Sequence, residues 1–331
     1  MPEPKPTPSP SSAALDRMAA LLALGALIFG AYALYTKLPR EKIGATLTRA
    51  LGEPTVTAVD LQTRHVEFVA DFYGHRYKGN TENLIDAHVL FYGAWEKSIL
   101  YFMRDCAKAT GKDGAFVDVG ANSGLHSLYM SSLVKQVHAV EPYPPALERI
   151  HDVVNRNNLT NVAIHPIGLG AEQSTMPFYE PVDSNIGTGS FLDGTYTLNH
   201  QEGLQLEIVR ADDYFEANGI DSIDMMKIDI EGFEKFAMAG MQEQLRKHRP
   251  IVIMELSVNP GRDELFGSMD ELVAAFPENY KLFGLPFTSF LSGSYELEPL
   301  TVDFSFRFQY DVIAVPAELA DRIPMEATYT E

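Results

Sequence analysis

The stretch AFVDVGANSG at residues 115–124 joins an apolar run to a glycine turn, and a helical pattern follows it. Its first five residues are apolar apart from Asp118, which is typical of a buried strand. Gly120 and Gly124 permit a tight turn, and a turn at a helix N-terminus lets backbone N–H groups approach a ligand closely. The stretch therefore predicts a strand, a ligand-binding turn and a helix, in that order.

The same alternation continues toward the C-terminus. Short apolar runs bounded by turn residues predict further strands at residues 136–140, 162–165, 224–228 and 251–254. Apolar residues at helical spacing predict helices at 125–133, 145–157, 233–240 and 268–276. Two later apolar runs, at 280–283 and 310–315, could add a final pair of strands. Alternating strands and helices form parallel crossovers, so we predict an open α/β sheet with helices on both faces.

Two acids accompany the glycine turn. Asp118 precedes Gly120 by two residues, and Glu141 ends the second predicted strand. The spacing differs from the Gly-x-Gly-x-x-Gly of dinucleotide folds, and a carboxylate beside the turn would repel a pyrophosphate but could receive an ammonium group. Glu141 stands where an acid can bind both hydroxyls of a ribose. The pattern predicts S-adenosylmethionine rather than NAD, bound by Asp118, Gly120, Asn122, Gly124 and Glu141.

Four blocks of sequence resemble one known family. They are FVDVGANSG at 116–124, VEP at 140–142, MKIDIEGFE at 226–234 and PIVIME at 250–255. Together they resemble the FkbM family of S-adenosylmethionine-dependent methyltransferases, from about residue 93 to about residue 315. His126, in the first predicted helix, departs from the family's pattern.

The resemblance implies a fold, an activity and further site residues. The fold is a Rossmann-like, seven-stranded class I methyltransferase sheet whose last strand is antiparallel, and the activity is O-methyl transfer to sugar or polyketide hydroxyls. Carried over to this sequence, Asp118 and Gly120 would hold the methionine part of the cofactor and Glu141 the ribose. Gly168 and Leu169, after the third strand, would lie near adenine.

Three more acids end the fourth and fifth predicted strands and are the candidate catalytic residues: Asp229, Glu231 and Glu255. Methyl transfer needs an oxygen nucleophile relieved of its proton, and a clustered carboxylate with a raised pKa could accept that proton. The cluster could instead bind a divalent metal that acidifies a substrate hydroxyl. A purely structural alternative has Lys227 neutralising one carboxylate while Glu231 caps the next helix.

The N-terminal region has a different composition. Residues 18–35 carry no charge, and as a helix they would span about 27 Å, near the thickness of a bilayer core. We predict one transmembrane helix at 18–36, and bases beyond it at Lys37, Arg40 and Lys42 place the following domain in the cytoplasm. A cleaved signal peptide and a buried amphipathic or core helix are the alternatives.

The predicted organisation has six parts. They are a Pro-rich disordered tail at 1–17, the anchor at 18–36, a linker at 37–62, an N-terminal hairpin and helix cap at 63–112, the methyltransferase domain at 113–316 and a C-terminal tail at 317–331. Within the cap, residues 65–78 predict a hairpin around Gly74, and 95–109 predict a helix.

Charge narrows the range of partners. The chain has 26 bases and 45 acids, and this net charge of −19 disfavours nucleic acid as a partner. We expect a membrane-anchored methyltransferase that uses S-adenosylmethionine and acts on a hydroxyl of a saccharide, a lipid-linked acceptor or another small molecule. The alternative is a noncatalytic, membrane-anchored scaffold that binds S-adenosylmethionine.

Overall fold

The computed structural model describes residues 55–59, 65–111, 114–181, 186–193, 200–257, 262–285, 293–301 and 310–329. The chain divides into two compact units at Glu53 and Pro54, and every described residue lies in the second unit. The predicted tail at 1–17 and anchor at 18–36 therefore lie outside the described residues. Within the described ranges, no helix combines the length and the hydropathy needed to cross a bilayer.

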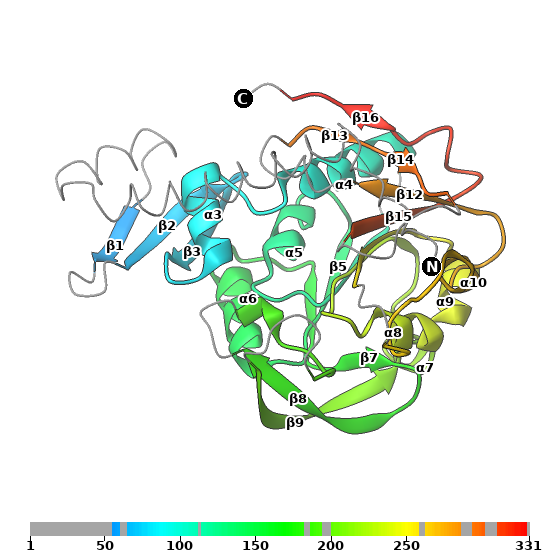
Figure 1. Cartoon of the computed structure of the whole chain (residues 1–331). Coiled ribbons are helices and arrows are strands. Elements are labelled where there is room, and N and C mark those ends of the chain that lie inside the picture. Colours follow the sequence, from blue (N-terminus) through cyan, green and yellow to red (C-terminus); the bar gives the residue numbers. More distant parts are fainter. Residues whose placement is uncertain are drawn as a thin grey trace, which may run out of the picture. The chain divides into compact units, whose positions relative to one another are not determined.

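A mixed sheet forms the centre of this unit (Figure 1). Its order is β14-β12-β15-β11-β10-β4-β5-β6. The strands are β4 (Ala115–Val119), β5 (Gln136–Val140), β6 (Val162–His165), β10 (Ile223–Ile228), β11 (Ile251–Leu256), β12 (Tyr280–Leu285), β14 (Glu298–Pro299) and β15 (Tyr310–Pro316). The strands from β6 to β11 are parallel to one another, whereas β15 is antiparallel to both of its neighbours.

The predicted sheet is confirmed in its essentials. Strands β4, β5 and β6 have the predicted bounds, and β10 and β11 are longer by one and two residues. The last pair of strands, β12 and β15, is present, and the last strand is antiparallel as the resemblance implied. The short β14 adds an eighth strand at the edge. This is an α/β fold with a mixed sheet.

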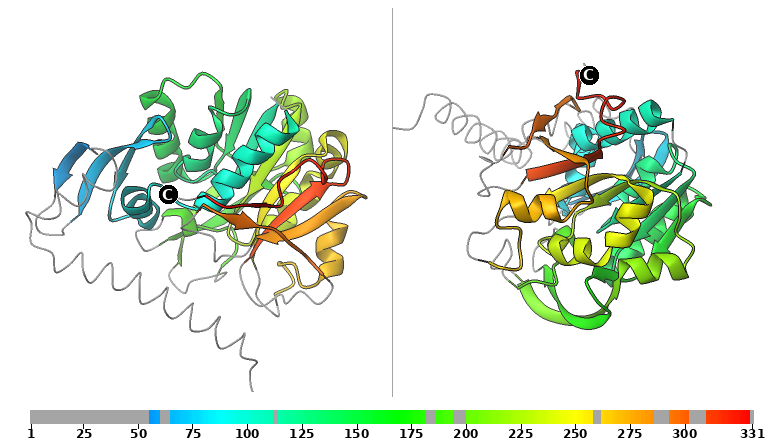
Figure 2. Two further views of the ribbon diagram at one scale, coloured as in Figure 1. Left: turned by 90° about the horizontal axis from the view of Figure 1, so that it is seen from above. Right: turned by 90° about the vertical axis from the view of Figure 1, so that its right-hand side faces the viewer.

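Helices cover both faces of the sheet (Figures 1 and 2). They are α4 (Lys97–Thr110), α5 (Leu125–Met130), α6 (Pro144–Arg156), α7 (Ala211–Ala217), α8 (Glu234–Gly240), α9 (Gln242–His248) and α10 (Met269–Ala274). One core cluster packs Val117 and Met226 of the sheet against Phe215, Met238 and Leu245 of α7, α8 and α9. A second cluster packs Ala139 of β5 against Ile150 of α6. Burial on both faces explains why the strands are almost continuously apolar.

Several elements outside this sheet have no counterpart in the prediction. Helix α3 (Leu84–Tyr92) follows the predicted hairpin, which is β2 (Val66–Phe72) and β3 (His75–Asn80). Residues 55–59, placed in the linker by sequence, form β1 (Thr55–Val59) and pair with β2. A second sheet, ordered β7-β9-β8, contains β7 (Gly168–Gly170), β8 (Ser174–Pro181) and β9 (His200–Arg210).

The C-terminal segment packs against the domain. Strand β16 (Glu326–Ala327), within the predicted tail, pairs with β13 (Tyr295–Glu296). Beyond it, the Tyr329 hydroxyl donates to Asp105 of α4, and the Arg104 guanidinium lies over the Tyr329 ring. Helix α4 is thus held by residues more than 200 positions later in the chain.

Candidate active site

The glycine turn after β4 joins three strand ends. Gly120 has φ +84°, and its N–H donates to the carbonyl of Val140 at the end of β5. A Cβ atom at this position would lie 1.8 Å from the carbonyl oxygen of Asp229, which follows β10. Only glycine fits both the backbone angle and the close approach. The turn therefore brings the residues that follow β4, β5 and β10 to a single site.

Two cavities open at this site, and both are lined by Gly120, Asn122, Gly187, Asp229 and Glu231. The larger has a volume of about 280 Å³ and the smaller about 50 Å³. In parallel sheets ligands bind beyond the carboxyl ends of the strands, and both cavities lie there.

Glu141 lines the smaller cavity with an aromatic pair. Its two carboxylate oxygens accept backbone N–H groups of Asn122, at 2.9 Å, and of Tyr143, at 2.8 Å. The Tyr143 ring stacks on Phe178, with centroids 5.1 Å apart. Each carboxylate oxygen has a second lone pair, so Glu141 can still accept a ligand hydroxyl. An acid beside flat aromatic walls suits a nucleoside.

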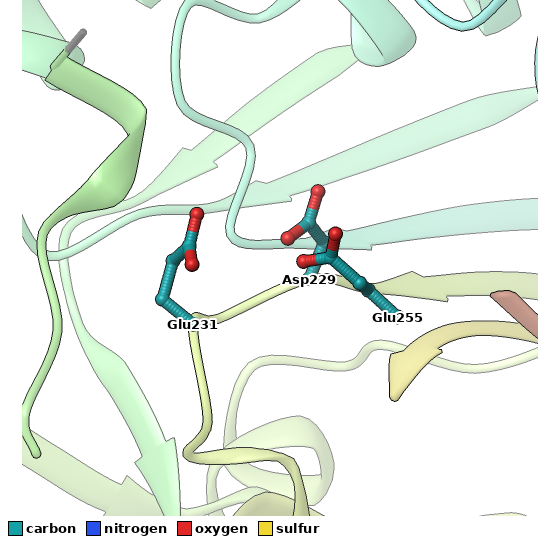
Figure 3. Close-up of side chains that lie close together, drawn as sticks. All are labelled: Asp229, Glu231 and Glu255. Atoms are coloured by element: carbon teal, nitrogen blue, oxygen red, sulfur yellow. The ribbon is translucent and has the colours of Figure 1, made fainter. Parts of the chain in front are cut away.

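The predicted acids Asp229, Glu231 and Glu255 come together at the larger cavity (Figure 3). One carboxylate oxygen from each lies within 4.8 Å of the others. Figure 3 shows the Asp229 and Glu255 carboxyl groups side by side, where they share a hydrogen bond. Three carboxyl groups at this separation repel one another unless protons or cations intervene.

Lys227 supplies the positive charge beneath the cluster. This side chain is almost fully buried in β10, and its ammonium lies 2.6 Å from Asp229 and 3.9 Å from Glu96. Burial disfavours the charged form, but the carboxylates of Asp229, Glu96 and Asp118 outweigh burial and raise the pKa of Lys227. The structural alternative was therefore right that Lys227 neutralises one carboxylate.

The three clustered acids respond differently to this ion pair. Although burial opposes ionisation, the Lys227 ammonium and hydrogen bonds hold the pKa of Asp229 at about 2. Burial, followed by repulsion from Asp229, raises the pKa values of Glu231 and Glu255 well above the usual range. Asp229 is thus a fixed anion, whereas Glu231 and Glu255 favour a proton or a bound cation.

The second part of the structural alternative, that Glu231 caps the next helix, was wrong. Glu234, the first residue of α8, accepts the N–H groups of Ile230 and Gly232. Glu231 instead adopts a left-handed backbone conformation with φ +53°, and its carbonyl accepts the Ser190 hydroxyl at 2.8 Å. Its carboxyl group is therefore free of a capping role and lines both cavities.

Three polar residues of the site have unusual backbones. Glu96, Asn122 and Glu231 all have φ values near +50° and all line the larger cavity. Left-handed backbone is costly for residues other than glycine, and such residues concentrate at functional sites. Their clustering at one cavity supports its assignment as the active site.

Two acids at this site were not foreseen. Glu96 precedes α4 and enters the larger cavity, and Asp311 of β15 lies opposite Glu255 in the strand register. Burial and then repulsion from Glu96 raise the pKa of Asp311 well above its usual range. The adjacent charges Glu96 and Lys97 at the start of an apolar helix were the available signal for the first of them.

Four predicted cofactor residues do not line either cavity. Asp118 is buried in β4 below the turn, where it accepts the Ser127 hydroxyl at 2.6 Å. Gly124 is the N-cap of α5. Gly168 and Leu169 are buried in β7 and line neither cavity, although the Cβ position of Gly168 lies 2.8 Å from the ring of Phe191, which lines the smaller one. Of the cofactor-binding prediction, the structure brings together Gly120, Asn122 and Glu141.

Comparison with known families identifies the domain that carries this site. The methyltransferase FkbM domain family matches residues 118–281, a range that contains the turn, Glu141 and the three clustered acids. Over this range, the chain belongs to the FkbM methyltransferase family. The FkbM assignment agrees with the sheet order and with the position of the cavities. The protein is a methyltransferase.

Characterised relatives are distant. The chain is 24% identical to "Methyltransferase 1" of Beauveria bassiana over 45% of this chain and 67% of the relative. It is 23% identical to "Hexuronic acid methyltransferase AglP" of Haloferax volcanii over 43% of this chain and 56% of the relative. It is 28% identical to "Methyltransferase sdnD" of Sordaria araneosa over 50% of this chain and 78% of the relative. All three names describe methyltransferases, as expected for the FkbM family.

The buried Glu141 predicts a pH-dependent stability. Burial raises its pKa to about 7 from 4.5, despite the two N–H groups that it accepts. Between these values the folded state keeps a proton that the unfolded state has released, so stability falls as pH rises. We expect wild type to lose about 2 kcal/mol more than Glu141→Gln between pH 5 and pH 8. Urea unfolding at both pH values measures this difference.

The exposed Glu216→Gln on α7 is the control and should follow the wild-type pH curve. If the pH dependences of Glu141→Gln and wild type are parallel, Glu141 is ionised in the folded protein over this range.

Proposed function

We propose that this FkbM methyltransferase transfers the methyl group of S-adenosylmethionine to a hydroxyl oxygen of a saccharide or a related small molecule. The observation that carries the proposal is the pair of adjoining cavities around Gly120 and Asn122. One contains Glu141 and stacked aromatic rings, and the other contains a cluster of carboxyl groups. This division suits a cofactor that has a nucleoside at one end and positive charges at the other.

The nucleoside end is assigned to the smaller cavity. Glu141 retains lone pairs for the ribose hydroxyls, and the Tyr143 and Phe178 rings provide apolar surface for a base. The glycine turn lies between the two cavities, where the backbone can approach the cofactor closely.

The cationic end is assigned to the larger cavity. S-adenosylmethionine carries a sulfonium and an ammonium group. Burial, followed by repulsion from Asp229, raises the pKa values of Glu231 and Glu255, so a further positive charge beside them would favour their ionised forms. Asp118 accepts a hydrogen bond from the Ser127 hydroxyl, and its negative charge helps to raise the pKa of Lys227. Binding of the cofactor would thus lower the electrostatic cost of ionising the cluster.

The reaction needs no covalent enzyme intermediate. An acceptor oxygen attacks the methyl carbon, the carbon–sulfur bond breaks toward sulfur, and the hydroxyl proton leaves for a base. The protein contributes alignment of the two reactants and a group that takes the proton. Asp229, Glu231 and Glu255 remain the candidate catalytic residues, since their carboxyl groups surround the space where the reactants would meet.

A divalent cation is the second use that the cluster allows. Carboxylate oxygens are the ligands that Mg²⁺ and Mn²⁺ prefer, and Asp229, Glu231 and Glu255 each offer one oxygen within 4.8 Å of the others. Activity measured after EDTA treatment, with and without added Mg²⁺ or Mn²⁺, separates this use from binding of the cofactor's own cationic groups.

We infer the class of methyl acceptor from the name of one relative and from the residues that line the larger cavity. The Haloferax volcanii relative is named for hexuronic acid, a sugar. The larger cavity offers carboxyl, amide and imidazole groups that can bind several hydroxyls of a saccharide. The net charge of −19 makes nucleic acid an unsuitable acceptor.

We propose that the protein is located at a membrane. This proposal is based only on the uncharged segment at 18–35. A single helix there, with the domain on the cytoplasmic side, would bring lipid-linked acceptors close to the active site. Extraction of membranes with alkaline carbonate tests the anchor. Retention of the full chain in the membranes would support it, and complete release would contradict it.

Calorimetric titration of the full chain with S-adenosylmethionine, and separately with NADH, tests the proposed cofactor. We expect micromolar binding of the first ligand and none of the second. At pH 8, where Glu141 is ionised, Glu141→Gln should weaken S-adenosylmethionine binding about 10-fold to 100-fold, because a charge-assisted hydrogen bond contributes about 1.5–3 kcal/mol.

The exposed Glu216→Gln is the matched control and should bind as wild type does. Binding of neither ligand by wild type would contradict the cofactor assignment. Binding without transfer to any acceptor, including membrane extracts, would favour a noncatalytic scaffold that retains the cofactor site.

A further inference from the structure

Two side chains that meet in the wall of the larger cavity have no part in the proton transfer described so far. Glu96 Oε2 lies 3.1 Å from His126 Nε2, and both residues are 8% exposed. They come from different elements, because Glu96 precedes α4 and His126 is the second residue of α5. Both line the cavity that contains Asp229, Glu231 and Glu255.

The two atoms depend on each other for a partner. Within the described residues, neither atom has a hydrogen-bond partner of good geometry, although the two lie 3.1 Å apart and the Lys227 ammonium lies 3.9 Å from Glu96 Oε2. Buried polar atoms rarely remain unsatisfied, so a proton between these two atoms is the arrangement that satisfies both. That proton belongs to Nε2, since a carboxylate is the stronger acceptor and accepts a charge-assisted hydrogen bond.

The backbone at Glu96 favours a functional role for this contact. Glu96 has φ +50° and ψ +48°, a left-handed conformation that is unfavourable for a residue with a side chain. As the N-cap residue of α4 it makes no side-chain capping bond, so helix capping does not explain its position. The strained conformation places its carboxylate against the imidazole and 3.9 Å from Lys227.

The tautomer of His126 decides which nitrogen of its imidazole ring can accept a proton. When Nε2 carries the hydrogen, the Nδ1 lone pair becomes the basic site of the ring. The charged groups around the ring are Glu96 ahead of α4, Lys227 and Asp229 in and after β10, and Glu231 and Glu255, all of which line the same cavity. Glu96 is the carboxylate that lies against the ring, 3.1 Å from Nε2.

The carboxyl cluster is less suited to accept the proton. Asp229 is held as an anion by the Lys227 ammonium at 2.6 Å, with a pKa of about 2. Glu231 and Glu255 are the groups proposed above to face the cofactor's positive charge, and pairing with that charge would weaken them as bases.

We propose that His126 accepts the proton of the acceptor hydroxyl through Nδ1, and that Glu96 is the positioning residue that holds the imidazole in the Nε2–H tautomer. The inference rests on the proposed methyl transfer. As the acceptor oxygen bonds to the methyl carbon, the carbon–sulfur electron pair moves to sulfur and the hydroxyl proton moves to Nδ1. The products are the methyl ether, S-adenosylhomocysteine and an imidazolium stabilised by Glu96.

The first test needs no acceptor. In the full chain labelled with ¹⁵N-histidine, comparison with His126→Gln assigns the His126 signals among the nine histidines. At a pH where the ring is neutral, we expect the Nε2–H tautomer in wild type. In Glu96→Gln we expect a mixture of tautomers. An Nδ1–H tautomer in wild type, or no change in Glu96→Gln, overturns the proposal.

The second test follows turnover with methyl-labelled S-adenosylmethionine and a detergent extract of the source membranes as acceptor pool. We expect His126→Ala to lower kcat by about 10²–10⁴-fold at unchanged affinity for S-adenosylmethionine, and added imidazole to restore part of kcat. Glu96→Gln should lower kcat less and should gain nothing from imidazole. His165→Gln, also 8% exposed but outside the cavity, is the control for replacing a buried histidine.

The outcomes separate the two proposals. No transfer by wild type defeats the proposed function and this inference with it. Transfer by wild type together with a normal kcat in His126→Ala defeats this inference alone. A loss in His126→Ala that comes with lost cofactor affinity and no rescue assigns His126 to binding and overturns its role in proton transfer.

Discussion

Replacing Lys227 with methionine is expected to lower the free energy of unfolding by about 3–5 kcal/mol, the usual cost of removing one partner from a buried ion pair. Lys227 is 3% exposed and lies 2.6 Å from Asp229 and 3.9 Å from Glu96. Methionine fills similar space but leaves both carboxylates without a compensating charge. The pKa of Asp229 should also rise from about 2. Urea unfolding at pH 7 measures the loss of stability.

Lys235→Met is the matched control. Lys235 lies in α8 and pairs with Glu271 at 3.2 Å, but its side chain is 34% exposed. Exposed ion pairs contribute about 0–1 kcal/mol, so the change should be small. Equal losses in the two variants would mean that the Lys227 charge adds nothing to stability. In that case the low pKa of Asp229 would need another cause.

Alanine at Gly120 is expected to destabilise the protein by more than about 3 kcal/mol and to abolish cofactor binding. The positive φ alone costs a residue with a Cβ about 1–2 kcal/mol. The added methyl would in addition lie 1.8 Å from the Asp229 carbonyl oxygen, a contact that requires β4 and β10 to move apart at the site. Unfolding in urea and titration with S-adenosylmethionine measure the two effects.

Gly74→Ala isolates the backbone contribution. Gly74 lies in the hairpin between β2 and β3 with φ +88°, and no atom of the residues that the structure describes lies within 4 Å of the Cβ position. This variant should lose only about 1–2 kcal/mol and should bind the cofactor normally. Similar losses in the two variants would show that the close approach at Gly120 relaxes without cost.

The central sheet was predictable because its strands are buried on both faces. Residues 115–119, 136–140 and 162–165 are short apolar runs bounded by turn residues, and burial on two sides requires that pattern. The second sheet was not predictable in the same way. Strand β8 is mostly half-buried and contains two prolines, so neither strict alternation nor a continuous apolar run marks it.

The site was only partly predictable, for a different reason. Gly120, Asn122, Glu141 and the three clustered acids follow strands that the sequence reveals, so their convergence follows from the topology. Glu96 lies outside the range that the FkbM family matches, and it reaches the cavity only because α4 packs beside α5. Asp311 faces the cluster because β15 inserts beside β11. Contacts between residues so far apart in the sequence leave no local periodicity to read.

The place of β15 in the sheet also bears on how the protein is made. Strand β15 is the last strand of the central sheet to be synthesised, yet it lies between β11 and β12. A nascent chain on the ribosome that ends before Tyr310 has made both neighbours but exposes their unpaired edges, which are sites for association with other chains. The sheet can close only after synthesis has passed Pro316 and that segment has left the ribosomal tunnel. Chains that stall before this point are therefore the ones most in need of a chaperone.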